Sequence, residues 1–128
     1  MDIKLGFIGT GNMGSALIKG IGKSGLIFPE NIFVFDKQME KAEELKKDSD
    51  LNVMKSTEEV VENSDIIILA VKPNIVKQVL EPCKSLFNGK KLLVSVAVGI
   101  PIKFYKDMLG EDRKIIRTMP NTPALVGE

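Results

Sequence analysis

A glycine-rich turn near the amino end is the feature of this sequence with the clearest chemical meaning. Gly9, Gly11 and Gly14 match the pattern G-x-G-x-x-G, which here follows a short apolar run and opens a helix-like stretch. In that context the first glycine permits a tight turn, the second lets the backbone approach a pyrophosphate, and the third lets the helix pack closely. Unpaired N–H groups at the helix start attract phosphate. The turn predicts a dinucleotide site, and the missing Gly-Lys-Ser/Thr excludes a Walker-type loop.

An acidic residue stands where a dinucleotide site binds the adenosine ribose. Asp36 ends a second apolar run, 22 positions after Gly14, about where an acid hydrogen-bonds the ribose of NAD. A carboxylate there repels a 2′-phosphate, whereas the neighbouring Lys37 attracts one. Asp36 is therefore a candidate cofactor-binding residue, with a solvated acid at a strand end as the alternative. Both NAD(H) and NADP(H) remain candidate cofactors.

Two further loops are expected to face the glycine turn. Val71-Lys72-Pro73 follows the most apolar run of the chain, and small residues surround Ala97 after the next run. Ligands of doubly wound proteins bind beyond the carboxyl ends of the strands at the switch point of strand order. Lys72 is a candidate for a cofactor phosphate or carboxamide, or is solvated. The small residues around Ala97 leave room for a nicotinamide ring, or pack in the ordinary way.

The elements that must position these residues alternate between strand-like and helix-like stretches. The expected strands cover 4–8, 32–35, 51–54, 66–71 and 92–96, with a last one starting at 115. The expected helices cover 13–23, 38–48, a stretch from 56, 74–87 (kinked or shortened by Pro82) and 101–109. Such alternation predicts an α/β fold: a Rossmann-like, doubly wound, mainly parallel sheet of about six strands with helices on both faces.

Composition excludes several classes of function. The 128 residues carry a net charge of +1, which argues against a nucleic-acid partner. No apolar run approaches the about 20 residues of a membrane span. The chain has no His and one Cys, so Ser-His-Asp catalysis and the usual zinc sites lack their residues, and no metal is expected. The lone Cys83 cannot form an internal disulfide, which fits a reducing cytoplasm.

Four blocks of the chain resemble the pyrroline-5-carboxylate reductase family. They lie at residues 7–14, 70–73, 95–100 and 117–124. The most specific parts are Asn12-Met13 in the glycine turn and the segment Met-Pro-Asn-Thr-Pro over 119–123. The resemblance implies hydride transfer from a reduced nicotinamide cofactor to the C=N carbon of 1-pyrroline-5-carboxylate, which yields L-proline. It leaves the catalytic residues and the proton donor unknown.

The resemblance also implies roles for individual residues. The pyrophosphate contacts would come from the turn, namely Ile8, Gly9, Thr10, Gly11, Asn12 and Met13. Val71, Lys72, Pro73 and Ala97 would border the ribose and nicotinamide, and Asn121 would lie where cofactor and substrate meet. Its alternative is a turn residue between two prolines. Val98 departs from the small residue usual in the family and is expected to narrow that edge.

Family members are about twice as long as this chain, which bears on its domain organisation. Residues 1–120 are expected to form the dinucleotide-binding domain, and 121–128 to begin the connection to a C-terminal helical dimerisation domain. The chain is then expected to bind cofactor and turn over poorly, and the full-length protein to be a homo-oligomer built on a dimer. Two alternatives are the front domain of a β-hydroxyacid-type dehydrogenase and a non-catalytic nucleotide-binding module.

Overall fold

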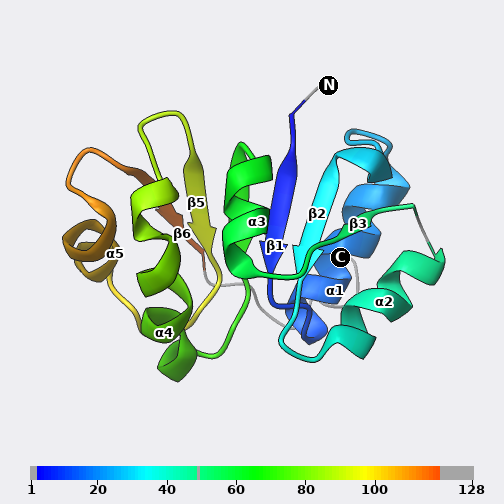
Figure 1. The fold of residues 1–128 in the computed structure, drawn as a ribbon, viewed down its shortest axis with the longest axis horizontal. Coiled ribbons are helices and arrows are strands. Elements are labelled where there is room, and N and C mark those ends of the chain that lie inside the picture. The colour runs from blue at the N-terminus through cyan, green and yellow to red at the C-terminus, as the bar shows by residue number, and fades with distance from the viewer. Residues whose placement is uncertain (1–2, 49, 119–128) are drawn as a thin grey trace.

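Six parallel strands form one sheet in the order β3-β2-β1-β4-β5-β6 (Figure 1). The structure is a computed structural model that describes residues 3–48 and 50–118. The strands are β1 Leu5–Ile8, β2 Ile32–Phe35, β3 Asn52–Val53, β4 Ile66–Leu69, β5 Leu92–Ser95 and β6 Lys114–Arg117. The order reverses between β1 and β4, as the sequence predicts. The predicted fold class is confirmed.

The central strands are apolar because both of their faces are covered. In β4, Ile67, Ile68 and Leu69 are all buried, and β4 pairs with β1 on one side and β5 on the other. Successive side chains point to opposite faces of a strand, so a run without alternation supplies both cores. Ile68 packs with one core cluster, whereas Ile67 and Leu69 pack with the other.

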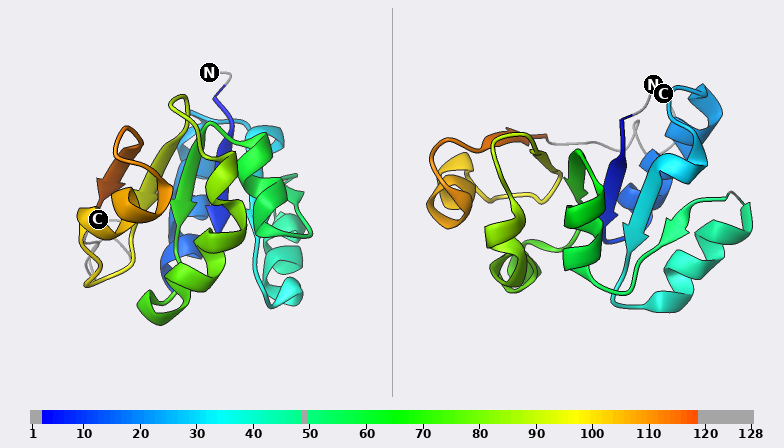
Figure 2. Two further views of the ribbon diagram at one scale, coloured as in Figure 1. Left: turned by 60° about the vertical axis from the view of Figure 1, so that its left-hand side comes forward. Right: turned by 45° about the horizontal axis from the view of Figure 1, so that its top comes forward.

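Helices cover the two faces of the sheet unequally. They are α1 Asn12–Ser24, α2 Met39–Asp48, α3 Thr57–Asn63, α4 Val76–Leu80 and α5 Ile102–Leu109, with short 3₁₀ helices η1 Pro29–Asn31, η2 Pro73–Ile75 and η3 Glu81–Leu86. Residues of α1 and α2 share one core cluster, and residues of α3, α4 and α5 share the other. Figure 1 shows α3 in front of the sheet and α1 behind it, and Figure 2 shows the same two layers from other sides. None of the helices in the described residues is long and apolar enough to cross a membrane.

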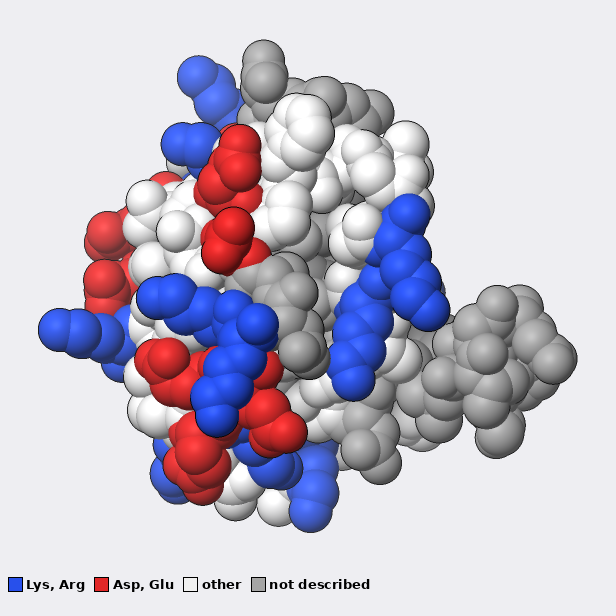
Figure 3. Space-filling model, turned by 90° about the vertical axis from the view of Figure 1, so that its right-hand side faces the viewer, with Lys and Arg blue, Asp and Glu red and all other residues white. Residues whose placement is uncertain are grey.

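Helix ends follow the expected capping chemistry. Ser56 Oγ accepts a hydrogen bond from the N–H of Glu59 at 3.2 Å, which confirms the predicted start of α3. At the other end of α3, Lys91 Nζ donates to the carbonyl oxygens of Val61 and Ser64 at 2.6 and 2.7 Å. The carbonyl of Val61 also accepts a long hydrogen bond from the N–H of Ser64 at 3.4 Å, and Lys91 adds a shorter contact to this end of the helix. The face that carries α2 exposes charges of both signs side by side (Figure 3).

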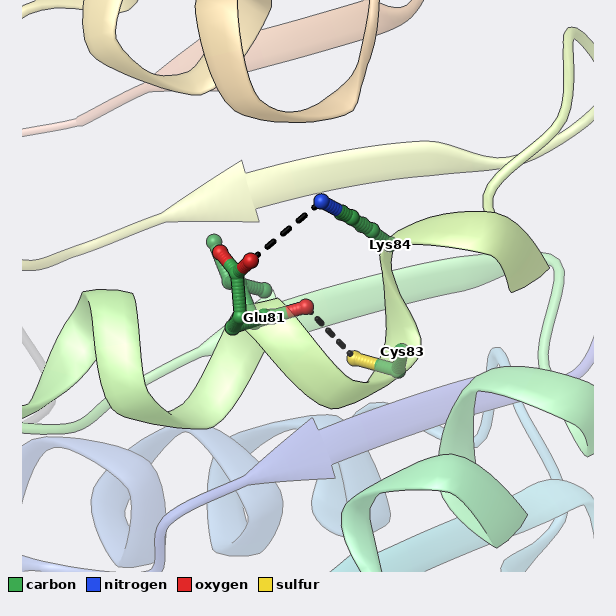
Figure 4. Close-up of polar contacts among 4 residues, drawn as sticks. Glu81, Cys83 and Lys84 are labelled. Carbon is green, nitrogen blue, oxygen red and sulfur yellow. Dashed lines mark hydrogen bonds and ion pairs between the residues drawn. The ribbon is translucent and has the colours of Figure 1, made fainter.

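The single helix expected over 74–87 is divided in the structure. It becomes η2, α4 and η3 in succession, and Pro82 lies in the first turn of η3. Proline has no N–H to donate to the preceding turn, and its ring crowds the carbonyl four residues earlier, so the α-helix ends at Leu80. The exposed Glu81–Lys84 ion pair at 3.2 Å adds little stability at this break (Figure 4).

Cys83 is expected to resist thiol reagents while the protein is folded. Its side chain is fully buried, and Sγ lies 3.5 Å from the carbonyl oxygen of Leu80 (Figure 4). Burial, assisted by the charge of Glu58, raises the pKa of Cys83 to about 12. Because the thiolate is the reactive species, a disulfide-exchange reagent at pH 8 should modify Cys83 in urea but hardly at all in buffer. Rapid modification of the folded chain would contradict this burial.

Candidate functional site

The glycine turn has the shape that the sequence predicts. Gly9 has φ +92°, and a Cβ there would lie 2.6 Å from the carbonyl oxygen of Ala70, so only glycine fits. A Cβ on Gly14 would lie 2.8 Å from the carbonyl oxygen of Gly9, which confirms that α1 packs closely on the turn. The N–H of Gly9 donates to the carbonyl of Phe35 at 2.8 Å and thereby joins the turn to the end of β2.

Gly11 differs from the other two glycines because its Cα faces open space. Apart from its two chain neighbours, no atom of the described residues lies within 4 Å of the position that a Cβ would take. Gly11 is the N-cap of α1, where no side chain accepts a hydrogen bond from the first turn and no acidic residue stands. The 13-residue helix thus presents uncapped N–H donors and the positive end of its dipole beside an unobstructed backbone. This arrangement suits an anion such as a pyrophosphate.

A groove of about 500 Å³ runs past the turn at the ends of β1, β2 and β4. Its lining includes the predicted residues Ile8, Gly9, Gly11, Asp36, Val71 and Lys72. A second hollow, of about 440 Å³, lies on the other side of the turn between α1 and α2 and is lined by Thr10, Gly11 and Ser15 with residues from both helices. Lys41 lines both hollows. The sheet topology therefore brings residues from three strand ends into one site.

Of the other predicted residues, Gly14, Pro73 and Ala97 do not line the groove. Gly14 is buried beneath the turn, and the backbone of Asn12 and Met13 forms the first turn of α1. Pro73 begins η2, and Ala97 is buried after β5. Asn121, with the rest of the block at 119–123, lies outside the described residues. Cofactor contact by each predicted residue stays a prediction.

Asp36 is held by the glycine turn itself. Its Oδ2 accepts hydrogen bonds from the N–H of Thr10 at 2.7 Å and from Thr10 Oγ1 at 2.6 Å, and Oδ1 accepts from the N–H of Gln38 at 2.8 Å. Partial burial raises the pKa of this carboxyl, but the hydrogen bonds from Thr10 and Gln38 and the charge of Lys41 outweigh burial and lower it. Asp36 is therefore an ionised acceptor at neutral pH.

The loop after β5 is pinned by a buried hydroxyl pair. Ser95 Oγ and the Tyr105 hydroxyl lie 2.5 Å apart, and the N–H of Ala97 donates to Ser95 Oγ at 3.2 Å. Arg117 donates to the carbonyl of Ile100 at 3.2 Å, at the far end of the same loop. Burial raises the pKa of Tyr105, against the effects of Ser95 and Arg117, so its hydroxyl keeps its proton. The side chain of Val98, at the tip of this loop, is 58% exposed.

Removing the Tyr105 hydroxyl is expected to destabilise the fold moderately. A Tyr105→Phe variant leaves Ser95 with one partner fewer and should lose about 1–3 kcal/mol of unfolding free energy. The double variant with Ser95→Ala should lose less unfolding free energy than the sum of the losses of the two single variants, because the two hydroxyls are hydrogen-bonded to one another. Urea denaturation of the four proteins measures this coupling. Strictly additive losses would show that the pair does not interact.

Three structural features, two of them in the site, have no clear signal in the sequence. Lys41 reaches the groove only because α2 folds back beside α1, and Thr10 meets Asp36 only because β2 lies next to β1. Gly6 in β1 is the third: a Cβ there would collide with Ser64 Oγ and lie 2.6 Å from Val60 Cγ1. The absence of that Cβ lets α3 lie directly over β1. A glycine inside an apolar run is the one hint available. No group of three or more His, Cys, Asp or Glu side chains able to hold a metal occurs among residues 3–48 and 50–118.

A family model described as NADP oxidoreductase coenzyme F420-dependent matches residues 4–99, about three-quarters of the chain. The chain belongs to this family. The matched range contains the glycine turn, Asp36 and the loops after β4 and β5, so the family assignment covers the groove.

Relatives of this chain carry the reductase name expected from the four blocks. The chain is 44% identical over 126 residues to the pyrroline-5-carboxylate reductase of Escherichia coli (strain K12), covering 98% of this chain and 47% of that protein. The crystal structure of the Plasmodium falciparum pyrroline carboxylate reductase with NADP bound shares 44% identity, with a TM-score of 0.84, over 98% of this chain and 45% of that one. The Coxiella burnetii pyrroline-5-carboxylate reductase shares 30% identity, with a TM-score of 0.92, over 98% and 47%.

The chain therefore spans about half the length of the curated relatives that it matches. The resemblance stated from the sequence blocks is confirmed, and so is the match to a Rossmann-like fold.

Proposed function

We propose that this chain is the cofactor-binding part of a pyrroline-5-carboxylate reductase. The complete enzyme would reduce the C=N bond of 1-pyrroline-5-carboxylate to L-proline, the last step of proline biosynthesis. When bound, NADH or NADPH supplies the hydride for that reduction. This chain's own part is to bind the dinucleotide and to orient its nicotinamide end toward the substrate.

One observation carries the proposal: the open backbone of Gly11 beside the uncapped start of α1, at the switch point between β1 and β4. A pyrophosphate needs both close approach to backbone and N–H donors, and both are offered there. The groove leads from this point past Asp36 on one side and past Val71 and Lys72 on the other. The NADP-bound state of the Plasmodium falciparum relative supports the same ligand class.

The finer roles belong to the same proposal. Val71, Lys72, Pro73 and Ala97 would border the ribose and nicotinamide, and Asn121 would meet the substrate. Residues 1–120 would form the dinucleotide-binding domain, with a C-terminal helical dimerisation domain beyond 121–128. Val98, Ile102 and Ile116 are exposed apolar side chains near the β6 edge of the sheet, which supports a further domain that packs against this edge. We also propose a cytoplasmic homo-oligomer, in keeping with the free thiol of Cys83.

Binding and turnover of this chain test separate parts of the proposal. Titration with NADH and with NADPH, followed by nicotinamide fluorescence, should saturate, and each ligand that binds should raise the melting temperature. Adding 1-pyrroline-5-carboxylate should consume little cofactor, because the rest of the substrate pocket is assigned to the C-terminal domain. Failure to bind either cofactor would refute the cofactor site. Fast turnover by these 128 residues would refute the division of labour between domains.

A further inference from the structure

Asp36 has fewer free acceptor sites than a ribose-binding acid needs. Each carboxylate oxygen accepts about two hydrogen bonds. Both positions on Oδ2 are taken by Thr10, through its N–H at 2.7 Å and its hydroxyl at 2.6 Å, and Oδ1 already accepts from the N–H of Gln38 at 2.8 Å. A ribose 2′,3′-diol that donates two hydrogen bonds would have to displace one of these contacts.

The same hydrogen bonds immobilise the centre of the glycine turn. Thr10 stands between Gly9 and Gly11 and is only 3% exposed. Asp36 holds its N–H and its hydroxyl, and Ser15 Oγ donates to its carbonyl oxygen at 2.7 Å. Every polar atom of Thr10 is therefore bonded to a neighbouring element. The peptide units on either side of Thr10, including the one that carries the N–H of Gly11, are fixed in orientation as a result.

We propose that Asp36 is a positioning residue: it holds the glycine turn, through Thr10, in the shape that binds a pyrophosphate, for NADH and NADPH alike. This inference rests on the proposed cofactor site and departs from the ribose role that the position of Asp36 suggests. Charge-assisted hydrogen bonds are short and strong, so they can fix the conformation of a turn that contains flexible glycines. Lys37 and Lys41 line the same groove and offset the carboxylate charge that would otherwise repel a 2′-phosphate.

The test compares ligands that use the turn with one that does not. Dissociation constants of NADH, NADPH and adenosine are measured for the wild type, Asp36→Ala, Thr10→Val and the double variant. Asp36→Ala should raise the dissociation constants of NADH and NADPH by a similar factor, about tenfold. Thr10→Val should raise both dissociation constants by a smaller factor. The double variant should bind both cofactors no more weakly than Asp36→Ala does. Adenosine, which has the ribose diol but no phosphate, should bind all four proteins equally.

The controls separate this proposal from its rivals. Thr10→Ser keeps the hydroxyl and should bind both cofactors as the wild type does. If circular dichroism shows that Asp36→Ala fails to fold, the comparison of Thr10→Val with Thr10→Ser is the readout. A selective loss of NADH and adenosine in Asp36→Ala, with Thr10→Val unaffected, would establish a direct ribose contact and overturn the proposal. Equal weakening of all three ligands would indicate general destabilisation and also overturn it. Absence of binding by the wild type would instead refute the cofactor site itself.

Discussion

A Gly11→Val variant is expected to fold normally and to lose dinucleotide binding. Apart from its chain neighbours, no atom in the part of the chain that the structure describes lies within 4 Å of the new Cβ, and the backbone there has φ −64°, which valine adopts without strain. The side chain would instead occupy the space through which a pyrophosphate reaches the N–H groups of α1. We expect affinity for NADH and NADPH to fall about 100-fold or more, the loss of roughly two charge-assisted hydrogen bonds.

Stability and a matched variant distinguish this result from unfolding. Valine is a poorer N-cap than glycine, so Gly11→Val should lose no more than about 1 kcal/mol of unfolding free energy. Gly20→Ala lies further along α1, also with open space around its Cβ. It should stabilise the helix by up to about 1 kcal/mol and bind as the wild type does. Fluorescence titration and urea denaturation provide both readouts. Unchanged cofactor affinity in Gly11→Val would show that the ligand does not approach this backbone.

A Gly6→Ala substitution is expected to lower the free energy of unfolding more than Tyr105→Phe or Gly11→Val does. Gly6 lies in the middle of β1, paired with Phe33 of β2 and Ile67 of β4, so the strand cannot move aside. The added Cβ would collide with Ser64 Oγ and lie 2.9 Å from Ser64 Cβ. Overpacking of this kind costs about 1–3 kcal/mol, and the rigidity on both sides of β1 places the expected loss at about 3 kcal/mol.

Removing the opposing side chain should restore part of the stability. Ser64 is buried at the end of α3, and its Oγ has no hydrogen-bond partner in the part of the chain that the structure describes. A Ser64→Gly change clears two of the three closest contacts, so Gly6→Ala with Ser64→Gly should be more stable than Gly6→Ala alone. Urea denaturation curves of the four proteins measure this coupling. If the second change brings no recovery, the contact with Ser64 is not what limits the size of residue 6.

Local patterns were enough to predict the strands, the placing of the first strand beside the fourth, and the glycine turn. The run over residues 66–71 indicates a buried central strand, and the structure keeps its core as β4, Ile66–Leu69. The strand ends two residues early because Ala70 and Val71 belong to the corner that faces Gly9. The shortening of the helix expected over 74–87 also follows from a local cause, the missing N–H of Pro82. Periodicity, capping and proline act over a few residues, so they are readable in sequence.

The sequence by itself determined that this chain has a parallel α/β fold with a phosphate-binding turn, because hydrophobic period and glycine spacing are properties of short segments. Only the tertiary structure decided what Asp36 contacts, which helix packs against Gly6, and that Ser95 meets Tyr105. Asp36 is 26 residues from Thr10, so their hydrogen bonds depend on how β2 lies beside β1. Such contacts are selected by side-chain geometry across neighbouring elements, and no spacing within one segment encodes them.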